Sequence, residues 1–146
     1  MATPTAHKDA QGQNVLGRDT RQYTDLDLFF GKKSVSKDIS KVTNIQAVKR
    51  AVRNLILTNH YEKPFHPEIG SGVRNMLFEP MTPLTAHILT RNIEDVITNF
   101  EPRAKLISVS AWPNLDRNEY ECTVSFFVVN TPTEQIDLTV MLERLR

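Results

Sequence analysis

Cysteine and tryptophan each occur only once in this 146-residue sequence, and it has no long apolar run. Because Cys122 has no partner, the chain can form no internal disulfide, and a reducing compartment suits it. The longest apolar run, Phe126–Val129, is far too short to cross a bilayer. The first ten residues are polar and do not resemble a signal peptide, so we expect a soluble protein with no membrane partner.

The net charge is small as well, at +1, and by itself it implies no electrostatic partner. Its distribution is uneven. Residues 1–60 hold ten Lys and Arg against five Asp, a net charge of +5, whereas residues 61–146 hold eight against twelve Asp and Glu, a net charge of −4. This asymmetry predicts a basic arm on a mildly acidic body. Such an arm suits an acidic protein surface, a nucleic acid or simply solvent.

A nucleic-acid surface would need basic residues interleaved with aromatic ones. The basic residues of segment 32–53 are Lys32, Lys33, Lys37, Lys41, Lys49, Arg50 and Arg53. Aromatic residues do not alternate with them, and the last three fall on the polar side of a predicted helix. The pattern therefore favours a solvated helix face over a nucleic-acid-binding one.

The N-terminal segment is predicted to be an arm. Residues 1–22 are polar, so we expect partners to order them. From Tyr23 to Phe30 the apolar residues Leu26, Leu28 and Phe30 alternate with other residues, which is typical of a strand. No hairpin mate is evident, which makes Leu26 and Leu28 candidate partner contacts. We predict an extended basic arm over residues 1–40 and one domain over residues 41–146.

Helical periodicity dominates the next part of the chain. Thr43 and Gln46 fit a capping box, and the apolar spacing that follows predicts a helix over residues 44–58. A loop with several Pro and Gly follows over residues 59–72, and then a short helix over residues 73–78. Thr82-Pro83 is the strongest helix start, because an N-cap hydroxyl precedes proline at the first helical position. Pro102 ends this second long helix.

Beyond Pro102 the apolar period changes to two. Three alternating segments begin near Ile107, Tyr120 and Ile136, and turn-forming residues separate them at 113–118 and 130–133. This pattern predicts a three-stranded antiparallel meander with one apolar face. Two main helices and a short one would cover that face, giving an α+β fold.

Metal and nucleophile chemistry find no support in the sequence. The four histidines lie at positions 7, 60, 66 and 87, and none has the spacing of a helical metal pair. Gly70-Ser71-Gly72 lacks the lysine of a phosphate loop and is better explained as a turn. Cys122 is predicted to face inward on a strand, where a thiol serves packing. We predict no cofactor, no metal ligand and no catalytic residue.

Paired carboxylates are the remaining catalytic alternative, because glycoside hydrolysis needs only two. Glu68 and Glu79 stand near the ends of loops and could approach each other through folding. Adjacent Glu94 and Asp95 point about 100° apart on a helix and cannot flank one bond. A peptidoglycan hydrolase therefore stays open as a second function beside an assembly protein.

Four segments together resemble the gene-25-like baseplate wedge family of contractile-tail phages, which has relatives in type VI secretion baseplates. They are Pro64–Gly70, Leu77–Thr85, Arg91–Glu94 and Phe100–Arg103, and the resemblance spans about residues 45–142. Family members often carry Glu-Ile-Arg in the strand before the final turn, where this chain has Thr123-Val124-Ser125. That departure removes any ion pair built there and leaves the strand pattern intact.

The resemblance implies a structural role in the virion, in the tail baseplate, after synthesis in the host cytoplasm. Such proteins surround the tail tube in a sixfold ring, contact other wedge proteins and template the first ring of tail sheath protein. Family members have also carried a lysozyme label, which no residue constellation here supports. We expect Arg91 and Arg103 to pair with Glu79, Glu94 or Glu101 and to shape baseplate contacts.

The last predicted strand, about Gln135–Leu142, ends the meander and should form an edge of the sheet. An edge strand has unpaired main-chain donors and acceptors. A sheath segment could add there by β-augmentation, with Gln135, Asp137 and Thr139 as the contacting residues. Alternatively, the segment Tyr23–Phe30 of the same chain covers this edge.

Overall fold

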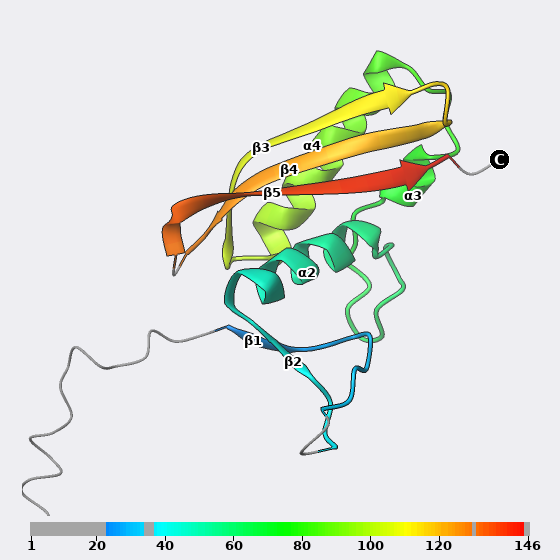
Figure 1. Cartoon of the computed structure of the whole chain (residues 1–146). Helices are drawn as coiled ribbons and strands as arrows, with labels where there is room; N and C mark the ends of the chain where they lie inside the picture. The colour runs from blue at the N-terminus through cyan, green and yellow to red at the C-terminus, as the bar shows by residue number, and fades with distance from the viewer. Residues whose placement is uncertain (1–22, 34–36, 130, 145–146) are drawn as a thin grey trace, which may run out of the picture.

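The computed structural model describes residues 23–33, 37–129 and 131–144, and Figure 1 shows an α+β fold, as predicted. Two short strands come first, and three helices and three long strands follow. The elements are β1 (Thr24–Leu26), β2 (Lys41–Thr43), α2 (Asn44–Leu57), α3 (Val73–Met76), α4 (Pro83–Phe100), β3 (Ala104–Asn114), β4 (Glu119–Val128) and β5 (Thr131–Glu143). Residues 1–22, the main part of the predicted arm, lie outside the described residues.

The three long strands form the predicted antiparallel meander, in the order β3-β4-β5. Along β4 the side chains of Tyr120, Cys122, Val124 and Phe126 are fully buried, while the residues between them are not. This alternation follows from the two-residue period of a strand with one covered face. The prediction fails at Ile107, which we expected on the apolar face. A bulge between Leu106 and Ser108 shifts the register there and leaves Ile107 45% exposed.

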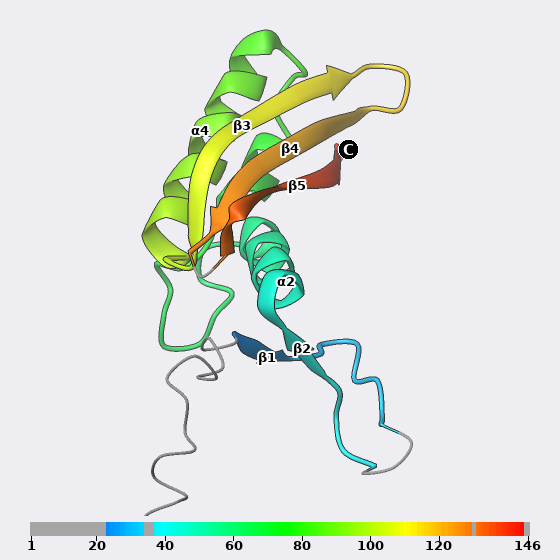
Figure 2. The same cartoon turned by 60° about the vertical axis from the view of Figure 1, so that its left-hand side comes forward.

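Helices α4 and α2 cover the apolar face of the sheet. Figures 1 and 2 both show α4 running along the β3 side and α2 lying on the β5 side. Their apolar stripes supply the core residues Val48, Val52, Ile56, Leu89, Ile93 and Ile97, each at most 1% exposed. Within the described residues, no helix is both long enough and apolar enough to cross a membrane.

The two predicted helix starts have different outcomes. At α4 the hydroxyl of Thr82 accepts a hydrogen bond from the Thr85 amide at 3.2 Å, and Pro83 occupies the first turn, as predicted. At α2 the predicted capping box is wrong, because the Thr43 side chain makes no capping bond. Asn44 has a φ of 54°, and its N–H donates instead to the Tyr23 carbonyl at 2.7 Å. The chain therefore enters α2 directly from a paired strand.

The arm contains a strand that does have a mate. β1 pairs antiparallel with β2 of the same chain, so the prediction of a strand without a hairpin partner is wrong. This small sheet is separate from the meander and lies on the far side of α2 (Figures 1 and 2). It does not cover the edge of β5. The strand is also shorter than predicted, because Phe29 lies in a turn and Phe30 has a φ of 53°.

Candidate functional site

Strand β5 forms one edge of the sheet, and its hydrogen-bonding pattern follows from the register. The N–H of Arg144 donates to the carbonyl of Asn118 at 3.0 Å, and these two residues continue the register of Glu119 with Glu143. In an antiparallel pair, hydrogen-bonded and non-hydrogen-bonded positions alternate. The even-numbered residues of β5 therefore bond to β4, and the odd-numbered residues direct their N–H and C=O groups away from it. Gln135, Asp137 and Thr139 all belong to this outward set.

The side chains of the same three residues lie on the uncovered face of the sheet, where all are exposed. The Ser125 hydroxyl donates to Asp137 Oδ1 at 2.7 Å, and Gln135 Nε2 donates to the same oxygen at 3.2 Å. Both hydrogen bonds lower the pKa of Asp137, and the bond from Ser125 has the larger effect. The β5 edge thus combines outward main-chain groups with a polar side-chain cluster.

The opposite edge of the sheet, β3, is less suited to pairing. Its ladder is interrupted by the bulge between Leu106 and Ser108. Pro113 lies opposite Tyr120, whose own main-chain groups point to β5 by the same alternation. Position 113 therefore faces outward, where proline has no N–H to offer. A bulge and an outward proline are ordinary ways of protecting an edge strand, and β5 has neither between residues 135 and 143.

Arg103 connects the end of α4 to the arm. Its Nε and Nη2 donate to the two carboxylate oxygens of Glu101 at 2.7 and 3.0 Å, and Nη1 contacts both oxygens of Asp25 at 3.1 Å. The guanidinium also lies over the Tyr23 ring, 5.6 Å from its centroid. The hydrogen bond to Glu101 is the main reason that the pKa of Arg103 is raised. The fork of Arg103 compensates the buried charge of Glu101, which is only 6% exposed.

A second arginine also pairs with an aspartate of the arm and lies over an aromatic ring, and it uses the residues that follow Asp25 in the chain. Arg50 on α2 pairs with Asp27, and its guanidinium lies 5.1 Å from the centroid of the Phe29 ring. Sequence reasoning assigned Arg50 to a solvated helix face and missed this contact. The available signal was the spacing of Tyr23, Asp25, Asp27 and Phe29, which places acid and aromatic groups on the same side of an extended chain.

The other predicted contact residues have different surroundings. Leu26 and Leu28 are 61% and 62% exposed, and both line, together with Arg50, a pocket of about 690 Å³. Arg91 is exposed on α4, and among the described residues no carboxylate lies within ion-pair distance of it. The predicted Arg103–Glu101 pair exists, whereas the pairing predicted for Arg91 does not.

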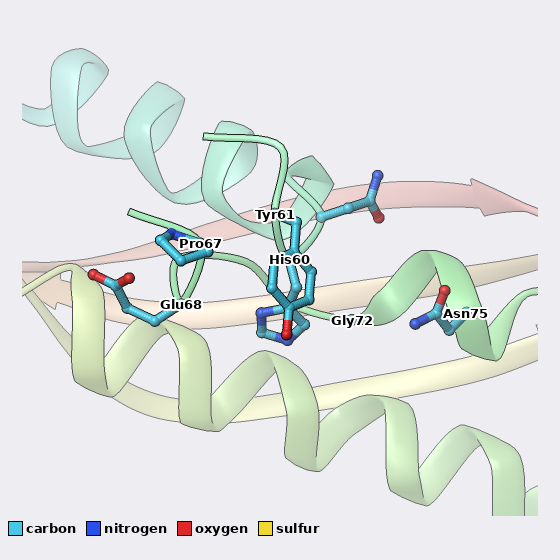
Figure 3. Close-up of a pocket in the computed structure, with 7 residues that line it drawn as sticks. His60, Tyr61, Pro67, Glu68, Gly72 and Asn75 are labelled. Carbon is cyan, nitrogen blue, oxygen red and sulfur yellow. The ribbon is translucent and has the colours of Figure 1, made fainter. Parts of the chain in front are cut away.

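The loop between α2 and α3 borders a pocket of about 700 Å³. Figure 3 shows Glu68 and Asn75 at opposite ends of it, with His60 and Tyr61 between them. Glu68 is the only carboxylate among the lining residues of this pocket. A smaller neighbouring pocket of about 310 Å³ is lined by both Glu68 and Asp95. Glu79, the other carboxylate of the alternative catalytic pair, lines neither of them.

Glu68 is exposed and lies 3.1 Å from Nδ1 of His66. A main-chain hydrogen bond lowers the pKa of the Glu68 carboxyl, and the bond to His66 adds to this effect. The general acid of a glycosidase needs the opposite shift, since it must be protonated near neutral pH. Cys122 is no better placed for chemistry, because burial raises its thiol pKa to about 12.

Comparison with known proteins identifies relatives. The family model described as "Baseplate wedge protein gp25" matches residues 42–133. The protein of that name from Enterobacteria phage T4 is 36% identical over 118 residues, which are 80% of this chain and 89% of the phage T4 protein.

Two solved structures share the fold at low sequence identity. A candidate tail lysozyme from Geobacter sulfurreducens has a TM-score of 0.62 at 20% identity, covering 68% of this chain and 89% of the other. A chain of the sixfold-symmetrised baseplate of the anti-feeding prophage has a TM-score of 0.60 at 18% identity, covering 86% of this chain and 88% of the other.

Proposed function

Because this chain belongs to the gp25 family of baseplate wedge proteins, we propose that it joins the inner baseplate of a contractile tail to the sheath and templates sheath polymerisation by β-strand addition. The observation that carries the proposal is the β5 edge. Residues 135–143 form an uninterrupted ladder with β4, and their odd-numbered members present main-chain groups to an incoming strand.

Strand addition at a single β5 edge contributes little binding free energy, so a template for the sheath would need several copies of this edge. An added strand that pairs with two or three of the outward residues makes about four to six main-chain hydrogen bonds, each contributing roughly 1 kcal/mol net. A single site of this kind binds weakly. Arranged in a ring, as in the sixfold baseplate of the anti-feeding prophage, several such sites raise the effective concentration of each neighbouring contact. Weak edges can then start a stable first ring of sheath.

A proline scan tests this proposal. Gln135→Pro, Asp137→Pro and Thr139→Pro each remove an outward N–H and leave every main-chain bond to β4 in place. Leu138→Pro is the matched control, because it removes a bond to β4 and should destabilise the sheet. We expect the three odd-position variants to fold and to enter the baseplate, and at least one of them to block sheath assembly on isolated baseplates. Normal sheath assembly on all three would exclude strand addition at this edge.

Three further residues that the sequence predicted as partner contacts are exposed and lie outside β5. We propose that exposed Leu26 and Leu28 on the arm and Arg91 on α4 contact neighbouring wedge proteins or the tail tube. Support comes from their exposure and, for Arg91, from the absence of a carboxylate partner among the described residues. These surfaces lie away from the β5 edge, so baseplate and sheath could be bound together.

We also propose that the protein has no hydrolase activity. The direction of the Glu68 pKa shift supports this, because an ionised carboxylate cannot act as general acid. Purified protein should leave peptidoglycan intact between pH 4 and pH 8, as measured by release of soluble fragments. Glu68→Gln, Asp95→Asn and Glu79→Gln are the controls. Fragment release that disappears in one of these variants would establish an enzyme instead.

A further inference from the structure

The C-terminal end of the β5 edge adjoins a cavity of about 350 Å³ between the sheet, α2 and α3. It is lined by Ile56, Leu57, Val73, Arg74, Leu77, Met141, Leu142 and Glu143. Resting on the proposed strand addition, we infer that this cavity is a side-chain pocket that selects the sheath segment. The segment it fits carries a large aliphatic or aromatic residue next to an acidic one.

The register of the sheet directs one side chain of an added strand into this cavity. Met141 and Glu143 present their main-chain groups outward, and Leu142 between them faces the helices. Side chains of laterally adjacent residues lie on the same face of a sheet. A residue that pairs beside Leu142 therefore also points to the helix side, where the cavity lies.

Six of the eight residues that line the cavity are apolar, the others being Arg74 and Glu143, and its rim is incompletely covered. Ile56, Val73 and Leu77 are buried, whereas Leu57 is 48% and Met141 is 51% exposed. An aliphatic or aromatic side chain in the cavity would shield the exposed part of Leu57 from water. In strand-addition complexes, main-chain bonds provide affinity while such pockets provide specificity.

Arg74 supplies the polar part of the selection. It lines the cavity together with Glu143, and among the described residues it has no carboxylate within ion-pair distance. An acidic residue beside the apolar anchor of the incoming segment provides a carboxylate that pairs with Arg74.

Photo-crosslinking on isolated baseplates tests the inference. The probe is the sheath protein of the same contractile tail. Benzoylphenylalanine replaces Leu57 at the rim, and Ile107, which is 45% exposed on the opposite edge, is the matched control position. We expect a crosslink from position 57 to a large apolar sheath residue with an acidic neighbour, and no sheath crosslink from position 107. A crosslink to a segment without that pattern, or to a second copy of this chain, overturns the inference.

Two charge variants give an independent measurement. Leu57→Glu and Arg74→Glu should each reduce the rate of sheath nucleation at least about tenfold, because they place negative charge beside the acidic segment. Ile107→Glu should leave the rate unchanged. The three outward proline variants at positions 135, 137 and 139 distinguish a failure of the pocket from a failure of strand addition. If at least one of them blocks nucleation while both charge variants nucleate normally, strand addition stands and the pocket is wrong. If none of the proline variants and neither charge variant affects nucleation, both are wrong.

Discussion

Arg103 and Arg50 use one combination of contacts twice, since each pairs with an aspartate of the arm and lies over an aromatic ring. Only Arg103 also binds a buried carboxylate, that of Glu101. A planar guanidinium can hold two carboxylates and stack on a ring at the same time, which an ammonium cannot do. Arg103 is therefore a residue whose chemistry, beyond its charge, matters for the fold.

Replacing Arg103 with lysine should accordingly be costly. Arg103→Lys keeps the charge but loses the fork that satisfies Glu101, and we expect the free energy of unfolding to fall by about 2 kcal/mol. Arg91→Lys is the matched control, because exposed Arg91 makes no ion pair with the described carboxylates, and it should change stability by less than about 0.5 kcal/mol. Urea denaturation followed by circular dichroism measures both values. Equal and small effects would reduce the Arg103 cluster to an ordinary surface ion pair.

Individual side-chain contacts also show which interactions could be predicted from the sequence. Sequence reasoning gave Glu101 as one of three carboxylates that could pair with Arg103, and the structure pairs Arg103 with this one, two positions away in the chain. It could not find the contact of Arg103 with Asp25, because these residues are 78 positions apart. Arg50 was assigned to solvent, since helical periodicity separates faces but does not show what packs against the polar one.

At the scale of elements, the helices and strands that were predicted correctly are those with a clear signal in their own local sequence. The start of α4 was predicted correctly because Thr82-Pro83 and the helix periodicity agree. The three long strands were found because apolar residues alternate with others along part of each, at Ile107–Ala111, Tyr120–Val128 and Ile136–Leu142. The alternation of Tyr23–Phe30 indicated the strand that contains β1, but β2 has only three residues and shows no such period, so the pairing of β1 with β2 depends on the tertiary fold.

The two helix starts permit a matched test of capping. Thr82→Ala removes a hydroxyl that accepts the Thr85 amide, and stability should fall by about 1 kcal/mol. Thr43→Ala removes a hydroxyl that makes no capping bond, so it should change stability by less than about 0.5 kcal/mol. The urea midpoints of both variants check this difference. A similar loss at Thr43 would mean that the predicted capping box forms in solution.

The β5 edge illustrates the limit of pattern reading at this scale. The sequence predicted an amphipathic strand at the end of the meander, but not which of its amides point outward. That choice depends on the register with β4, which the Arg144–Asn118 bond determines. The bulge at Ile107, which helps to distinguish the two edges, leaves no comparable signal in the sequence.

For the whole molecule, the main question is how firmly the arm belongs to the domain. The division at residue 40 stays a prediction, and it passes between two strands that pair with each other. Four side-chain contacts across the division add to the pairing of β1 with β2: those of Tyr23 and Asp25 with Arg103, and those of Asp27 and Phe29 with Arg50. Residues 1–22 lie outside the described residues.

Two deletions of different length address this question. Removing residues 1–22 retains all four contacts, and the thermal midpoint should stay within about 2 °C of the full chain. Removing residues 1–40 deletes β1 and leaves Arg50 without Asp27, and Arg103 without Asp25. Losing about 2 kcal/mol in this way should lower the midpoint by roughly 5–10 °C. Because the core of α2, α4 and the meander lies beyond residue 40, the shorter protein should still unfold cooperatively.

Both deletions should weaken incorporation into baseplates, but for different reasons. The shorter deletion removes basic residues that suit an acidic partner surface. Because salt screens such an attraction, its defect should be larger at low salt than at high salt when compared with the full chain at matched salt. The longer deletion also removes exposed Leu26 and Leu28, and its defect should persist at every salt concentration. Co-sedimentation with baseplates lacking the endogenous protein measures both. If removing residues 1–40 alters neither the thermal midpoint nor incorporation, the arm neither stabilises the domain nor binds a baseplate partner.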